Sequence, residues 1–150
     1  MRRRNNNAAG RQSAVGNRMA DENIIRSYRD LRVWNEAMEL AVACYRMTRA
    51  FPREEIFGMT SQIRRAGASV PANIAEGYGR DSAGSYVQFL KNAQGSLKEL
   101  ETHVLLAHRV ELVSKEAAAP VLDRAEMMGK MLRGLIRSIQ TSGQSTGVPS

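Results

Sequence analysis

The stretch from Ser82 to Val110, SAGSYVQFLKNAQGSLKELETHVLLAHRV, decides the fold. Its apolar residues recur in alternating steps of four and three, which places them on one face of a helix. No stretch of the chain sustains the period-two alternation of a half-buried strand. We therefore predict a helix from near Ser82 to about Val110, with a core stripe formed by Tyr86, Leu90, Ala93, Leu97, Leu100, Val104 and Ala107.

Three further stretches have the same helical spacing. They run from Asp30, a good N-cap, to about Ala50, from about Met59 to Tyr78, and from Ser114 to about Ser142. Their predicted core stripes are Leu31, Trp34, Met38, Ala41, Val42 and Tyr45, then Ile63, Ala66, Val70, Ile74 and Tyr78, then Ala118, Val121, Ala125, Met128, Leu132, Leu135 and Ile139. Short connections make successive helices antiparallel, so we predict an all-α, up-down-up-down four-helix bundle.

The two ends of the chain lack this apolar pattern. We expect a disordered basic arm over residues 1–27, a bundle over residues 28–142 and a flexible tail over residues 143–150. The formal net charge is +7, and seven arginines against two acids give the first 29 residues a balance of +5. The remaining residues hold fifteen basic and thirteen acidic side chains, so the bundle itself is mildly basic.

Several classes of protein fit the sequence poorly. The single cysteine, Cys44, allows no intrachain disulfide, and its position beside an apolar face is typical of a buried small hydrophobe. Glu99 and His103 are too few to hold a metal. We find no catalytic motif, so we expect no enzyme activity and no cofactor. No apolar run reaches the roughly 20 residues that cross a bilayer, which favours a cytoplasmic location.

Cationic side chains form the candidate binding surfaces. Arg46 and Arg49 lie at the end of the first helix, and Lys130, Arg133 and Arg137 share one face of the last. Such a face could follow a nucleic-acid backbone, or it could be ordinary solvated surface. Repeated around an oligomer, with a basic arm on every copy, it would become a multivalent phosphate binder.

The helix from Met59 to Tyr78 carries a polar stripe that includes Arg65, and Arg64 adjoins it. These arginines could contact phosphate or a neighbouring subunit, or they could pair with Glu99 or Glu101 of the next helix and fix the packing. Pro71 lies inside this helix, where it removes a backbone hydrogen bond, and Gly67 reduces the crowding four residues earlier. We assign a structural or interface role to Pro71, Asn73, Glu76, Gly77, Glu99 and Glu101.

The last helix also carries three methionines. Met128 belongs to the predicted core stripe, whereas Met127 and Met131 lie on its flank. Because methionine adapts to irregular surfaces, the flanking pair could contact another subunit or complete the edge of the core.

Three segments together resemble a known family. They are Phe51-Pro52, GMTSQIRRA at residues 58–66 and SVPANIAEGYGR at residues 69–80, supported by GSLKELET at residues 95–102 and LRVW at residues 31–34. They resemble the four-helix bundle proteins encoded by intervening sequences in bacterial 23S rRNA genes, over about residues 28–140. The resemblance implies a homo-oligomeric, pentameric ring without enzymatic activity and with a suspected nucleic-acid role. A distant branch assists the reverse transcriptase of diversity-generating retroelements.

Two functions follow as hypotheses. The first is a non-catalytic oligomer that binds nucleic acid, RNA or DNA, through its basic surface without strong sequence specificity. The second is a protein–protein adaptor or scaffold for a partner enzyme such as a reverse transcriptase, in which the basic surface steers the encounter.

Overall fold

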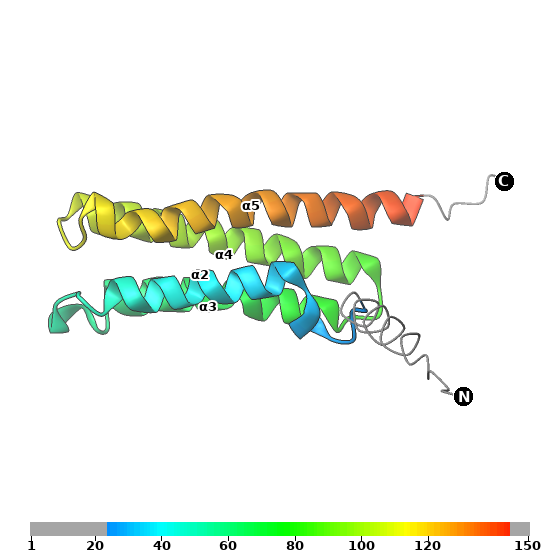
Figure 1. Ribbon diagram of the computed structural model, residues 1–150, viewed down its shortest axis with the longest axis horizontal. Helices are drawn as coiled ribbons and strands as arrows, with labels where there is room; N and C mark the ends of the chain where they lie inside the picture. The colour runs from blue at the N-terminus through cyan, green and yellow to red at the C-terminus, as the bar shows by residue number, and fades with distance from the viewer. Residues whose placement is uncertain (1–23, 145–150) are drawn as a thin grey trace, which may run out of the picture.

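The computed structural model describes residues 24–144, and within this range it contains helices and no strand (Figure 1). The four long helices are α2 (Arg32–Thr48), α3 (Met59–Tyr78), α4 (Ala83–Arg109) and α5 (Lys115–Gln144). Short 3-10 turns, Tyr28–Asp30 and Arg53–Glu55, precede α2 and α3. The predicted arm up to residue 23 and the predicted tail from residue 145 lie outside the described residues.

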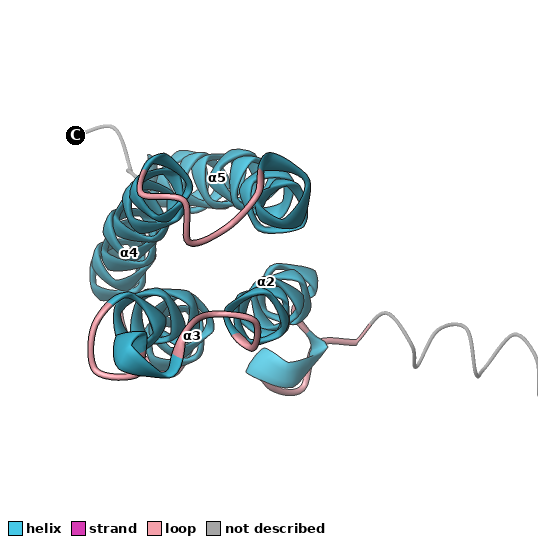
Figure 2. Ribbon diagram, turned by 90° about the vertical axis from the view of Figure 1, so that its left-hand side faces the viewer, coloured by secondary structure: helices cyan, strands magenta, loops and turns pink. Residues whose placement is uncertain are grey.

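The helices form a four-helix arrangement in which neighbours in sequence are neighbours in space. Each helix packs on the next, α3 and α4 share the most extensive contact, and α2 closes against α5 (Figure 2). Within the described range the backbones of α2 and α4, and those of α3 and α5, do not approach each other closely, so the helices occupy the corners of a square. Successive helices run in opposite directions (Figure 1), as predicted from the short connections.

The predicted core stripes of α3, α4 and α5 are confirmed in their central turns. Leu90, Leu100 and Leu132 are fully buried, and the partly exposed Tyr86, Leu135 and Ile139 pack against the edge of the core. Ser82 and Ser114 cap α4 and α5, since their Oγ atoms accept hydrogen bonds from backbone N–H groups three residues later. Helix α5 ends at Gln144, two residues beyond the predicted end.

The predicted start of the first helix is wrong. The Asp30 carboxylate accepts the backbone N–H groups of Arg26 at 2.8 Å and Ser27 at 3.1 Å, and so closes the capping box of the preceding 3-10 turn. These hydrogen bonds lower the pKa of Asp30. Helix α2 begins two residues later, at Arg32, with no side-chain cap. The Asp30 carboxylate therefore binds the segment before it and not the helix that it was expected to cap.

The predicted core face of α2 is also wrong. The buried residues of this helix are Val33, Ala37, Leu40, Cys44, Met47 and Thr48. Of the predicted stripe, Leu31 and Trp34 pack partly against the core, but Met38, Val42 and Tyr45 are 39%, 37% and 46% exposed. The helix has two neighbouring apolar arcs, and helical spacing alone does not tell which arc faces inward. The second arc is therefore an apolar surface.

Two buried glycines let helices approach closely. A Cβ atom at Gly67 would lie 2.9 Å from the Sγ atom of Cys44, so this glycine allows α2 and α3 to pack tightly as well as easing Pro71. A Cβ atom at Gly77 would lie 2.7 Å from the Cβ atom of Phe89 on α4. Pro71 is buried within α3, which is assigned as one helix through it. Pro71 and Gly77 thus both lie buried inside the bundle.

Candidate functional site

The cations predicted on the last helix lie beside a groove between α4 and α5, which we call the α4–α5 groove. Two adjoining cavities of about 330 Å³ each form it, and both are lined by Lys98, Gly129 and Arg133. Lys130 lines the first cavity, together with Leu105 and Leu122 from the two helices. The groove therefore has a mixed lining of apolar side chains, three cations and two acids, since Glu101 and Glu126 also line the first cavity.

The cations of this groove differ in how far they are neutralised. The Nζ atom of Lys98 lies 3.0 Å from Glu101, and that of Lys130 lies 3.8 Å from Glu126. Arg133 forms no ion pair with any described residue. Arg133 is thus the cation in this groove whose charge is available to an anion such as phosphate.

The structure brings together only part of the predicted cationic set. Lys130 and Arg133 share the groove, whereas Arg137 lies one turn further along α5 and does not line it. Sequence reasoning missed Lys98, which supplies the cation on α4. Lys98 follows the buried Leu97 directly, but only the order of packing in the bundle shows that it faces α5.

Arg64 and Arg65 lie on α3, beside a separate cavity that Tyr45 and Ile56 also line. The Nε atom of Arg64 donates to the Oγ1 atom of Thr48 at 2.8 Å, and its guanidinium carbon lies 4.6 Å from the centre of the Tyr45 ring. The Thr48 hydroxyl in turn donates to the carbonyl of Cys44 at 2.8 Å. Arg64 therefore joins α3 to α2, while Arg65 is exposed.

The remaining polar residues make local contacts. Asn73 donates to the carbonyl of Ser69, whose hydroxyl contacts that of Ser96 on α4 at 2.8 Å. Glu76 pairs with Arg80 at 3.0 Å. Glu99 pairs with His103, and Glu101 with Lys98, all within α4. Of the two alternatives for the arginines of α3, pairing with Glu99 or Glu101 is therefore not seen among the described residues, because these acids pair with side chains of their own helix.

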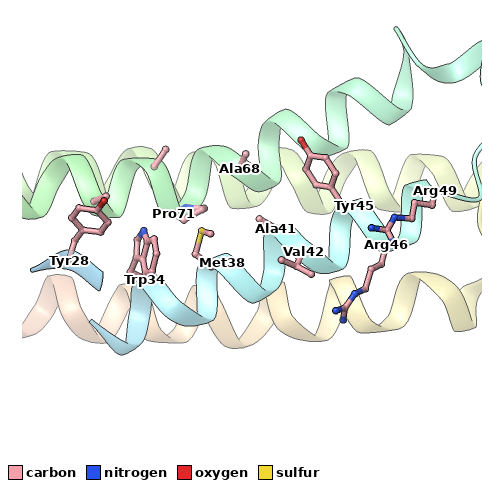
Figure 3. A pocket seen from close by; sticks show the side chains of 12 residues that line it. Tyr28, Trp34, Met38, Ala41, Val42, Tyr45, Arg46, Arg49, Ala68 and Pro71 are labelled. Carbon is pink, nitrogen blue, oxygen red and sulfur yellow. The ribbon is translucent and has the colours of Figure 1, made fainter. Parts of the chain in front are cut away.

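A second surface, the α2–α3 groove, is apolar and lies on the exposed arc of α2 (Figure 3). Its volume is about 590 Å³, the largest of the described cavities. Trp34, Met38, Val42 and Tyr45 form one side, and Pro71 with three alanines of α3 forms the other. The α2–α3 groove therefore has larger side chains on one wall and small ones on the other.

Arg46 and Arg49 lie at one end of the α2–α3 groove (Figure 3). Neither forms an ion pair with a described residue. The structure thus separates them from the cations of α5, with which they were grouped as candidate nucleic-acid contacts, and places them beside an apolar surface instead.

Neither a metal-binding cluster nor a reactive thiol is present among the described residues. They contain no group of three or more side chains suited to hold a metal ion. Cys44 is buried, as predicted, and burial raises its pKa to about 12, which suppresses the reactive thiolate. None of the described helices is long and apolar enough to span a bilayer.

Comparison with known proteins identifies relatives by family and by fold. The family model for the 23S rRNA-intervening sequence protein matches residues 29–134. A crystal structure from Bacteroides thetaiotaomicron VPI-5482, described as a protein with unknown function from the S23 ribosomal protein family, is 26% identical with a TM-score of 0.63. The match covers 69% of this chain and 97% of that one. No curated protein matches. The extent of the family match shows that the chain belongs to the 23S rRNA-intervening sequence protein family.

Proposed function

We propose that this chain is a non-catalytic, self-associating four-helix bundle that binds nucleic acid, RNA in the first instance, along the α4–α5 groove. The observation that carries the proposal is the guanidinium of Arg133, which has no ion pair with a described residue and lines the groove together with Lys98 and Lys130. An arginine without an acidic partner can donate two parallel hydrogen bonds to a phosphate. The family name, which refers to 23S rRNA, supports RNA as the first ligand to test.

One copy of the groove would bind only weakly. Lys98 and Lys130 are partly neutralised by Glu101 and Glu126, so the local excess of positive charge is small. Self-association multiplies it, because each added copy contributes another Arg133 and another leading segment with a balance of +5 over residues 1–29. Since the contacts are made to phosphates, the binding would show little sequence preference.

Fluorescence anisotropy with labelled RNA at two salt concentrations tests the proposal. We expect tight binding at low salt and a steep loss as salt rises, because neutralised phosphates release counterions. Equal affinity for unrelated sequences is expected as well. Absence of binding at low salt contradicts the proposal.

The α2–α3 groove favours a second candidate, a protein adaptor, because an open apolar groove is a common docking site for a partner helix. An adaptor would retain one specific partner protein after nuclease treatment of a cell extract. A pull-down that loses all its partners on nuclease treatment supports nucleic-acid binding over the adaptor.

A further inference from the structure

We propose that the α2–α3 groove of one copy receives the outer face of α5 from a second copy, so that copies associate head to tail. We call that outer face the α5 ridge and define it by Glu116, Pro120, Asp123 and Met127. The inference rests on the self-association in the proposed function and assigns the two surfaces that meet.

The α5 ridge is a single row of exposed side chains. Steps of four, three and four residues place its members on one face of the helix, away from the buried Val121, Ala125 and Met128. Met127 is 46% exposed, a large apolar side chain without cover. Glu116 and Asp123 form no ion pair with a described residue. The ridge therefore combines an apolar side chain with unpaired negative charge.

The α2–α3 groove has the complementary chemistry. Its wall of Met38, Val42 and Tyr45 is apolar and exposed. Its cations, Arg46 and Arg49, form no ion pair within residues 24–144. The groove would bury Met127, and the arginines would meet the acids of the ridge. Such rim charges chiefly set the orientation and the rate of encounter.

The two surfaces also lie at matching levels along the bundle. An ion pair of 3.9 Å between Glu36 and Arg124 shows which parts of the antiparallel helices α2 and α5 are level. At about 1.5 Å per residue, Arg46 lies about 15 Å from Glu36, and Glu116 lies about 12 Å from Arg124, toward the same end.

On the other side of the ion pair, Trp34 and Met127 lie about 3 Å and about 4.5 Å from its two members. Where the axis that relates neighbouring copies is parallel to the helices, every residue keeps its own level. Such an axis would therefore bring Arg46 toward Glu116 of the next copy and Trp34 toward Met127.

The groove and the ridge share no residue, so this contact is heterologous. After every association step the open assembly would still carry one free groove at one end and one free ridge at the other. Assembly therefore continues until it closes into a ring or extends as a filament. A groove-to-groove contact would instead stop at a dimer.

Two substitutions separate these arrangements. Val42→Glu places a charge in the groove and Met127→Glu places one on the ridge, both at partly exposed positions where the bundle can still fold. We expect the mass of each variant, measured by light scattering, to fall to that of one chain, 16.6 kDa. An equimolar mixture should form a dimer and nothing larger, because one intact groove and one intact ridge remain. Leu106→Glu, at a comparably exposed position on α4, is the control and should assemble normally.

Charge reversal provides an independent measurement. Arg46→Glu and Glu116→Arg should each weaken association several-fold, and the double variant should recover most of the loss. Lys91→Glu, which reverses an exposed cation elsewhere, is the control. Circular dichroism confirms that each variant is folded.

The outcomes that overturn the inference are specific. Normal assembly of Met127→Glu, or a mixture that stays monomeric, rules out the groove-to-ridge contact. Loss of assembly in Leu106→Glu alone assigns the contact to α4. RNA binding by the wild-type chain is measured separately, so the failure of this interface and the failure of nucleic-acid binding are distinguishable.

Discussion

The Sγ atom of Cys44 lies 2.9 Å from the position that a Cβ atom on Gly67 would occupy. Cys44 is fully buried on α2, and Gly67 is buried on α3. The two helices are therefore closely packed at this level, and separating them would open the core. The close approach of α2 to α3 at this level holds the walls of the α2–α3 groove together.

Replacing Gly67 with alanine should therefore destabilise the bundle. We expect Gly67→Ala to lower the free energy of unfolding by about 1–3 kcal/mol, because overpacking outweighs the better helix propensity of alanine. The substitution should cost less in a Cys44→Ala background, where the sulfur is absent. Urea unfolding of the two single variants and the double variant measures this coupling. Equal costs in both backgrounds would contradict the account.

The buried thiol of Cys44 should make stability depend on alkaline pH. Burial raises its pKa from 9.0 to about 12 in the folded chain, whereas the unfolded chain releases the proton near the ordinary value. The folded state therefore loses stability as pH rises from about 9 to about 12, by at most about 1.4 kcal/mol per pH unit. The difference in unfolding free energy between wild type and Cys44→Ala, measured at pH 8 and pH 10.5, should shift in favour of the variant. A difference that does not change with pH would contradict this.

Substitution of Arg64 should lower the stability of the bundle and have little effect on its affinity for RNA. Its side chain bonds Thr48 and stacks on Tyr45, so Arg64→Ala should cost about 1–2 kcal/mol in thermal or urea unfolding. Affinity for RNA should stay within about twofold of wild type at fixed salt. A large loss of RNA affinity with unchanged stability would instead assign Arg64 to the binding surface.

Substitution of Arg133 should lower the affinity for RNA and have little effect on stability. Arg133→Ala removes a cation that has no acidic partner among the described residues of the α4–α5 groove. RNA affinity should therefore fall, and the salt dependence should become shallower by about one phosphate contact. Its melting temperature should change little. Arg53→Ala, which removes an exposed cation from a 3-10 turn, is the matched control and should bind as wild type does. Equal effects of the two substitutions would show that only net charge matters.

The sequence was sufficient to predict the helices and most of the core. Long, regular stripes such as the one from Leu90 to Ala107 have one apolar face, and that face must be buried. Helix α2 was predicted less well because it has two apolar arcs. The buried arc contains Val33, Leu40 and Cys44, and the more exposed arc contains Trp34, Met38 and Val42. Cys44 packs against α3 at Gly67, where there is no side chain in the way. The spacing of apolar residues within α2 cannot predict this contact, because it depends on the sequence of α3.

The candidate site was predicted less completely for the same reason. Lys130 and Arg133 could be grouped from their spacing on one helix, but Lys98 joins them only through the packing of α4 on α5. Arg46 and Arg49 resembled other basic patches in sequence, and their apolar surroundings depend on which arc of α2 is exposed. The charge pattern of one helix can thus be predicted from the sequence. A surface that two helices share can be identified only when their packing is known.

Self-association and RNA binding are tested together by the mass of the purified full-length chain, measured by light scattering at low salt with and without RNA. We predict a mass several times the 16.6 kDa of one chain, and a larger particle with RNA that dissociates into protein and RNA at high salt. A single-chain mass that RNA does not change would contradict both the self-association and the nucleic-acid role.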